Sequence, residues 1–174
     1  MRMKVIPWSE VETWRCCGYG ECCKPYTVPL STWEWTRITQ TYGISVTEIS
    51  VDGLFLKKKQ GRCIFQYMQG GKWLCAIQHL KPLACRLWPF KIFRRPKYGR
   101  AEKAALESGG RRMFVYVDPL CPTLKLGEPS EEFLKNILPE FINISLSTYE
   151  EQYYSTMRSE RAHQRHPLAT SRLI

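Results

Sequence analysis

Helical periodicity is clearest in the segment that follows Pro29. Ser31 and Glu34 have the spacing of a capping box, in which each side chain bonds the backbone N–H of the other residue. We therefore predict a helix from Thr32 to Tyr42 that ends at Gly43. Its expected packing residues are Trp33, Trp35, Ile38 and Tyr42.

Short apolar runs bounded by turn residues predict strands further along the chain. The predicted strands cover residues 54–56, 63–67, 73–77, 90–95 and 113–117. Gly70-Gly71 separates two apolar runs as a hairpin turn does, so Cys63 and Cys75 are expected near one another on paired strands. Residues 57–59, three lysines, are expected on an exposed link.

Further helical segments are predicted between and after these strands. Short turns are expected at 47–51 and at 79–87, the second interrupted at Pro82, and residues 101–108 are predicted to be helical. Near the C-terminal end, Ser130 begins a helix whose apolar positions lie before Pro139. Another helix is predicted from Ser147 to about residue 161, and the rest has no periodicity.

These elements predict an α+β fold, with a small antiparallel sheet and short helices around a cysteine-rich metal centre. The chain of 174 residues is 44% apolar, which is enough for a core. The expected organisation is a cysteine-cluster domain over residues 1–129, a helical C-terminal extension over 130–162 and a basic flexible tail over 163–174.

Eight cysteines are the strongest chemical feature of the sequence. Four of them share eight positions with Gly18 and Gly20, whose flexibility lets a chain bend tightly around an ion. Prolines on both sides of Cys85 predict a stiff loop suited to a ligand. Thiolates are ligands for zinc and for iron–sulfur clusters. The candidate metal ligands are Cys16, Cys17, Cys22, Cys23, Cys63, Cys75, Cys85 and Cys121.

Zinc and a four-iron (4Fe-4S) cluster are favoured about equally, because each takes four thiolates and eight cysteines allow two such sites or one site with spare thiols. His79 lies between Cys75 and Cys85 and is the one histidine considered as a further ligand. The N-terminus lacks the apolar core of a signal peptide, and no run of about 18 apolar residues occurs. A cytoplasmic protein with no membrane contact and no disulfide-linked partner is therefore expected.

The order of these motifs resembles the YkgJ-like cysteine-cluster family, whose members are described as zinc- or iron-chelating proteins. The resemblance covers about residues 14–123. It rests on Trp14, Cys16, Gly20, Cys22, Cys23, Glu34, Cys63, Cys75, Ile77, the segment 81–90 around Cys85, and Cys121-Pro122. Lys81 stands where the family has arginine. The resemblance implies metal binding, and some relatives are associated with protein methylation.

One position departs from the family pattern. Tyr19 occupies the place of the family's second cysteine, and Cys17 is an additional thiol beside Cys16. There are two alternatives. Either Cys17 replaces the missing ligand, or the Tyr19 side chain closes that coordination position to any ligand.

The net positive charge of the chain suggests a nucleic acid as a binding partner. Twenty-six Lys and Arg residues against sixteen Asp and Glu residues give a formal net charge of +10. Basic residues are interleaved with Trp88, Phe93 and Tyr98, a composition suited to a phosphate backbone with stacked bases. The candidate nucleic-acid contacts are Arg86, Lys91, Arg94, Arg95, Lys97, Arg100, Arg111 and Arg112. A solvated basic surface is the simpler alternative.

Two functional hypotheses follow. The first is a metal-binding module that contacts RNA or a ribonucleoprotein such as the ribosome. The second is an iron–sulfur redox protein or a component of a protein-methylating enzyme. The sequence contains no Gly-x-Gly-x-x-Gly loop, Walker sequence, Gly-x-Ser-x-Gly elbow or His-Glu-x-x-His motif, so it assigns no catalytic residue.

Overall fold

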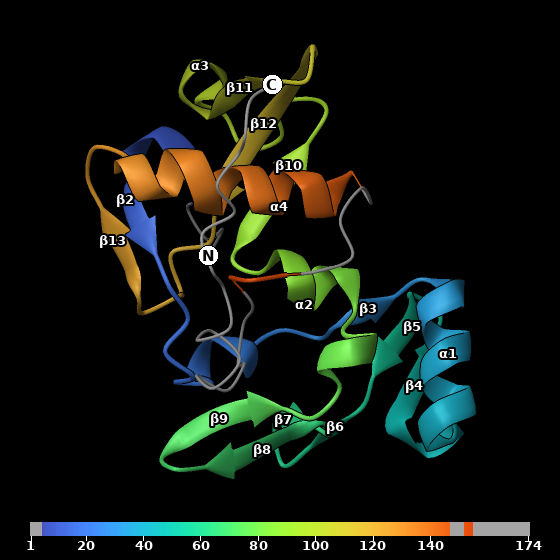
Figure 1. The fold of residues 1–174 in the computed structure, drawn as a ribbon. Coiled ribbons are helices and arrows are strands. Elements are labelled where there is room, and N and C mark those ends of the chain that lie inside the picture. Colours follow the sequence, from blue (N-terminus) through green and yellow to red (C-terminus); the bar gives the residue numbers. More distant parts are fainter. Residues whose placement is uncertain (1–4, 147–151, 155–174) are drawn as a thin grey trace, which may run out of the picture.

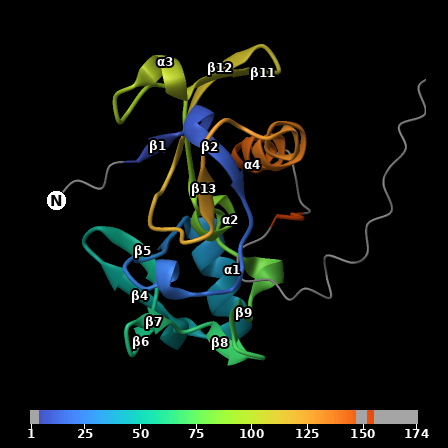
Figure 2. The same cartoon turned by 90° about the vertical axis from the view of Figure 1, so that its left-hand side faces the viewer.

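The computed structural model describes residues 5–146 and 152–154. The chain forms two parts that lie one above the other, with the short helix α2 (Leu83–Leu87) between them (Figure 1). The upper part contains strands from both halves of the chain, and the lower part contains the strands β3 to β9. The view turned by 90° shows the same separation (Figure 2).

Strand β12 (Arg111–Val117) is the centre of the upper part. Strand β10 (Phe90–Phe93) pairs with one of its edges, and β1 (Ile6–Pro7) and β11 (Ala105–Ser108) pair with the other, all antiparallel. A separate two-stranded sheet joins β2 to β13. The remaining elements of this part are η1 (Trp8–Glu10), β2 (Val11–Trp14), α3 (Ala101–Ala104) and β13 (Leu124–Leu126).

A C-terminal helix packs against the upper part. It consists of a π-helical turn, η5 (Phe133–Ile137), that continues directly into α4 (Leu138–Ser145). Its side chain Phe141 contacts the rings of Trp14 and Phe90, with ring centroids 5.4 Å and 4.2 Å away. The helix therefore shares one hydrophobic core with the sheet.

The lower part has its own core. Helix α1 (Thr32–Tyr42) packs against a three-stranded sheet of order β3-β5-β4. The core residues are Leu30, Ile38, Leu56, Phe65 and Ile77. Two small hairpins, β6-β7 and β8-β9, complete this part. The bounds are β3 (Pro29–Leu30), η3 (Ile44–Val46), β4 (Thr47–Ser50), β5 (Gly53–Leu56), β6 (Lys58–Lys59), β7 (Arg62–Cys63), β8 (Gln66–Gln69), β9 (Lys72–Cys75), η2 (Glu21–Cys23) and η4 (Gln78–Leu80).

The predicted α+β class is confirmed, and so is the first helix. Ser31 caps α1, and Glu34 completes the capping box, with the helix ending at Tyr42 before Gly43. Trp33 was expected to pack in the core, and this prediction is wrong. Its side chain is 65% exposed, and the Arg37 guanidinium lies 4.6 Å from its ring centroid.

Two other segments predicted to be helical form strands, one over nearly its whole length and the other only in its second half. Residues 47–50 form β4, because β-branched side chains suit a strand and β5 offers an edge for pairing. Residues 101–108 are helical only as far as Ala104. The segment after it pairs with β12 through a Gly109-Gly110 turn, so hairpin formation overrides the helical propensity of Ala105 and Leu106.

The C-terminal helix continues past Pro139, which the sequence pattern had placed after its apolar positions. The π-helical turn before it widens the hydrogen-bonding register, and such a turn tolerates a residue that lacks a backbone N–H. The helix predicted from Ser147 to about residue 161 and the basic tail over 163–174 fall outside the described residues, except for residues 152–154. No helix in the described part of the chain has the length and apolar character needed to cross a membrane.

Two residues of α1 provide a test of the lower core. Ile38 is 1% exposed, whereas Trp33 on the same helix is largely in solvent. We expect Ile38→Ala to lower the free energy of unfolding by about 2–5 kcal/mol, because it leaves a cavity. Trp33→Ala should change it by less than about 1 kcal/mol. Urea denaturation of both variants measures the difference, and equal losses would contradict this packing.

Candidate metal centre

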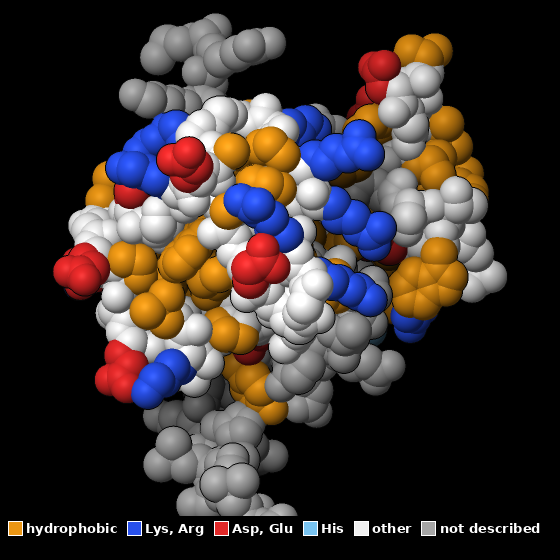
Figure 3. All heavy atoms as spheres, turned by 90° about the horizontal axis from the view of Figure 1, so that it is seen from above, with side chains coloured by type: hydrophobic (Ala, Val, Ile, Leu, Met, Phe, Trp, Pro, Cys, Tyr) orange, Lys and Arg blue, Asp and Glu red, His pale blue; other side chains and the backbone are white. Residues whose placement is uncertain are grey.

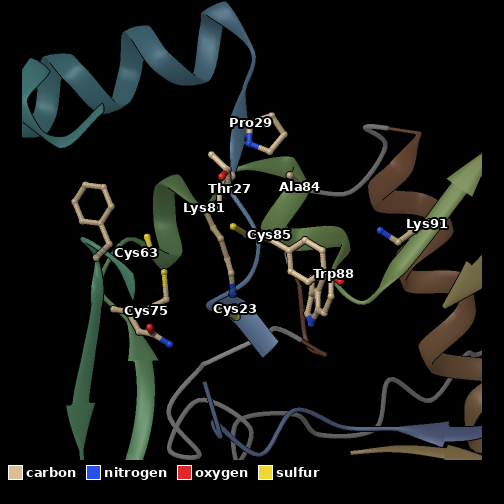
Figure 4. Close-up of a pocket in the computed structure, with 14 residues that line it drawn as sticks. Cys23, Thr27, Pro29, Cys63, Cys75, Lys81, Ala84, Cys85, Trp88 and Lys91 are labelled. Carbon is tan, nitrogen blue, oxygen red and sulfur yellow. The ribbon is translucent and has the colours of Figure 1, made fainter. Parts of the chain in front are cut away.

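Four cysteine side chains line one cavity of about 270 Å³ where the two parts of the molecule meet. Cys23 comes from η2, Cys63 from β7, Cys75 from β9 and Cys85 from α2. Figure 4 shows the sulfur atoms of Cys63 and Cys75 side by side, with that of Cys85 across from them. The fold thus brings together thiols from segments up to about sixty residues apart in sequence.

The N-terminal cysteine loop is attached to the hairpin β8-β9. Trp73 donates its backbone N–H to the carbonyl of Gly18 at 2.6 Å, and the Gln66 side chain donates to the carbonyl of Gly20 at 3.3 Å. Gly20 has a φ of 75° and lies so close to Trp73 that a Cβ there would meet the tryptophan side chain at 2.5 Å. Only glycine satisfies both conditions.

Ion pairing fixes the same loop from the other side. Arg62 bonds the Glu21 carboxylate at 2.8 Å, and its guanidinium lies 3.7 Å from the Trp73 ring centroid. Lys58 donates to the backbone carbonyl of Lys24 at 2.7 Å. These contacts place Cys23 beside the hairpins that present Cys63 and Cys75.

The prediction that Cys63 and Cys75 lie near one another on paired strands is correct only in part. Both line the cavity, but Cys63 pairs with Lys58 in one hairpin and Cys75 pairs with Gln66 in the next. The predicted strand over 63–67 is interrupted between β7 and β8, which creates the two hairpins.

Cys85 lies on a short helix within the segment 79–87, where a helical turn was expected, and not on the stiff loop expected from its flanking prolines. Pro82 precedes α2, and its carbonyl accepts the backbone N–H of Cys85 at 2.9 Å. The carboxylate of Glu34 accepts the N–H of Leu83 at 2.6 Å while also completing the capping box of α1. One glutamate therefore caps two helices and fixes the orientation of the helix that carries Cys85.

A buried lysine lies among these thiols. Lys81 is 8% exposed and donates to the Gln78 side chain at 3.3 Å. Burial lowers the pKa of Lys81, and the thiols of Cys75, Cys85, Cys16 and Cys23 act in the opposite direction. Lysines are rarely buried without compensating negative charge.

Burial also governs the protonation of the thiols. Loss of hydration raises the pKa of Cys85 to about 12, although Lys81 opposes the shift. Desolvation likewise raises the pKa of Cys63. Both groups are protonated thiols near neutral pH when no cation binds them, so a metal ion must displace their protons.

The remaining predicted ligands lie in different surroundings. Cys16 is half-buried and packs against the upper core, within electrostatic range of Lys81. Cys17 is exposed. Cys121 is buried in the upper core, where its sulfur accepts the Trp14 indole N–H at 3.0 Å. The side chain of Cys22 lies outside the described residues. His79 is exposed and contacts the Tyr42 hydroxyl at 3.3 Å.

The predicted nucleic-acid contacts are also dispersed. Lys91 lines the cavity and pairs with Asp118 at 3.4 Å, Arg100 pairs with Glu10, and Arg112 lies 3.8 Å from Glu107. Phe93 and Tyr98 pack against Tyr116, and the Tyr98 side chain is 44% exposed. The backbone carbonyl of Arg86 accepts from the Gln152 side chain. The exposed members are Arg94, Arg95, Lys97, Arg100, Arg111 and Arg112.

The four cysteine side chains are ligands of the type that a thiophilic metal binds. Within residues 5–146 and 152–154, no three His, Cys, Asp or Glu side chains are close enough to form a coordination shell. The thiols surround a cavity instead, and a metal would draw Cys23, Cys63, Cys75 and Cys85 inward. Four thiolates with one zinc ion carry about −2, and the Lys81 ammonium offsets part of that charge.

Comparison with known proteins supports this chemistry. A family model described as a “putative zinc- or iron-chelating domain” matches residues 15–122, more than half of the chain. Searches of curated proteins and of solved structures found no match.

Sequence reasoning assigned no role to Lys81, to Arg62 or to the second bond of Glu34. The sequence did contain a signal for Lys81, because the family that the chain resembles has an arginine, also a cation, at that position. Arg62 and Glu34 act through partners that are distant in sequence, and no local pattern reveals such partners.

A matched pair of glycines tests the attachment of the cysteine loop. Gly20 and Gly71 both have a φ of 75°, but a Cβ at Gly71 would meet nothing within 4 Å. Gly71→Ala should cost about 1–2 kcal/mol of stability from the left-handed backbone alone. Gly20→Ala should cost about 1–3 kcal/mol more, because the Trp73 side chain must move. Urea denaturation measures both, and equal costs would show that the close approach to Trp73 is not required.

Proposed function

The chain belongs to the family of zinc- or iron-chelating domains, and on that premise we propose that Cys23, Cys63, Cys75 and Cys85 bind its metal. The observation that carries the proposal is that these four thiols line a single cavity. A metal site needs ligands from several rigid segments, and the four elements here are fixed by hydrogen bonds and ion pairs.

Both metals named by the family are compatible with this donor set. Zinc takes four thiolates at about 2.3 Å and contributes folding energy directly. A four-iron cluster also takes four cysteines and supplies redox chemistry. Lys81 contributes to either case by compensating negative charge in a buried site. Cys16 is the proposed reserve ligand, since it lies near the same lysine.

Serine substitutions at Cys85 and at Cys121 distinguish a ligand in the cavity from a thiol in the upper core. Cys85→Ser should reduce bound metal to less than about half and lower the melting temperature, because a serine hydroxyl is a poor ligand for these metals. Cys121→Ser is the control, since Cys121 is buried in the upper core, where it bonds Trp14. It should retain the metal.

The measurement is metal and acid-labile sulfide analysis, with an absorption spectrum, on full-length protein purified without oxygen. Zinc without sulfide assigns a structural site. Iron with sulfide assigns a cluster, and it favours a redox or protein-methylation role. Loss of metal in Cys121→Ser together with retention in Cys85→Ser would overturn the proposed ligand set.

We also propose that the basic upper face contacts single-stranded RNA or a ribonucleoprotein. Several Lys and Arg side chains occur on this face among apolar ones (Figure 3). Arg94, Arg95 and Arg111 are exposed, and they form no ion pair with any residue that the structure describes. Such cations are available to phosphates, whereas Arg100 and Lys91 already have carboxylate partners.

Salt dependence tests this second proposal. Replacing Arg94, Arg95 and Arg111 by Gln should reduce the slope of log affinity against log salt by roughly 2 for a short oligouridine. Replacing the exposed lysines Lys57, Lys59 and Lys125 by Gln removes the same charge from other surfaces. Equal slopes for the two triple variants would mean that this face has no special role.

A further inference from the structure

The helix that carries Cys85 is too short to hold its own position. α2 has five residues, whereas isolated helices shorter than about 12–15 residues are marginal in water. Its orientation therefore comes from contacts with other elements. Helix α4 packs against it, and at its N-terminal end the Glu34 carboxylate accepts the backbone N–H of Leu83 at 2.6 Å.

The opposite end of α2 is held by the docked segment, residues 152–154. The Gln152 side chain is 9% exposed, and its amide donates to the backbone carbonyl of Arg86 at 2.8 Å. Carbonyls in the last turn of a helix have no partner within the helix, and this bond satisfies one of them. Figure 1 shows the docked segment as the short red-orange piece beside α2. Side chains from distant parts of the chain thus hold both ends of α2.

A buried carboxylate anchors the docked segment to the C-terminal helix. Glu140 of α4 is 7% exposed and accepts the backbone N–H groups of Tyr153 at 3.1 Å and Tyr154 at 2.8 Å. Hydrogen bonds to an ionised acceptor are roughly twice as strong as neutral ones. The Tyr154 side chain also packs against the upper core, and its hydroxyl donates to Glu132 at 3.3 Å. The segment therefore connects the upper core to the helix of Cys85.

Cys85 differs in this respect from two other thiols of the cavity. Cys63 and Cys75 lie on strands that neighbouring strands hold through backbone hydrogen bonds. Cys85 lies on a helix whose two ends are held by the side chains of Glu34 and Gln152. Because Arg86 follows Cys85 directly, loss of the Gln152 bond frees the end of α2 next to this thiol. Cys85 is then the thiol that leaves the cavity with the smallest change in the rest of the fold.

We propose that the docked segment controls the release of metal from the cavity. While Gln152 bonds the Arg86 carbonyl, α2 keeps Cys85 against the metal. When that bond opens, α2 tilts, the bond between the metal and the Cys85 sulfur breaks first, and the metal passes to an acceptor in solution. The inference rests on the proposed function, because it concerns the metal bound by these thiols. Gln152 is a positioning residue, since it acts through α2 and not on the metal itself.

The rate of metal release from the full-length protein tests this control. Gln152→Glu keeps the shape of the side chain but replaces the donor amide by a carboxylate that repels the Arg86 carbonyl. It should accelerate release about five-fold or more. Gln69→Glu introduces the same charge on the exposed strand β8 and should leave the rate unchanged. Excess 4-(2-pyridylazo)resorcinol reports released zinc, and loss of cluster absorption in excess EDTA reports released iron.

The unfolding rate of the same metal-loaded samples separates control of release from a general loss of stability. Far-UV circular dichroism in urea should show unfolding of Gln152→Glu accelerated less than about two-fold, because α2 opens locally. Equal acceleration of release and unfolding, or unchanged release, overturns the inference. If Gln152→Glu does not fold, Glu140→Gln replaces it. This variant removes the charge that anchors the docked segment and should accelerate release about two-fold or more.

Metal content, measured on every sample before release begins, separates this inference from the proposed function. Wild-type protein without metal overturns both proposals. Wild-type protein that holds metal and releases it no more slowly than Gln152→Glu overturns only the role of the docked segment. Faster release from Gln152→Glu than from Gln69→Glu, at similar unfolding rates, supports control by residues 152–154.

Discussion

A buried lysine is the constraint on which the centre of this molecule depends. Lys81 is almost entirely buried, and the groups around its ammonium include the thiols of Cys75 and Cys85. Neutral thiols compensate a cation poorly, whereas thiolates bound to a metal compensate it well. The same burial that raises the pKa of Cys85 makes free thiolates unfavourable. A metal ion bound by these thiols would resolve the opposing demands of the site.

The supporting contacts explain how a site with ligands from four segments keeps its geometry. Glu34 caps α1 and α2 together, so one carboxylate joins the lower core to the helix of Cys85. The ion pair of Arg62 with Glu21 connects the N-terminal loop to the hairpins. Because these contacts join segments distant in sequence, a metal would stabilise both parts of the molecule at once.

The rings of Tyr26 and Trp88 pack together in the lining of the cavity that the thiols share. Asp118 belongs to the upper part, while Tyr26 belongs to the segment leading into the lower sheet. Their hydrogen bond therefore joins the two parts directly beside the thiols.

The sequence by itself determined the local features and the chemistry. The capping box fixed α1, the Gly70-Gly71 turn marked the hairpin β8-β9, and the cysteine motifs indicated a thiolate metal site. Tertiary structure alone decided which thiols share a cavity. Cys121 and Cys85 look equivalent along the chain, yet Trp14 holds one in the upper core and Glu34 directs the other to the cavity. Local propensity acts over a few residues, whereas a shared cavity depends on packing between distant segments, so no local pattern could separate them.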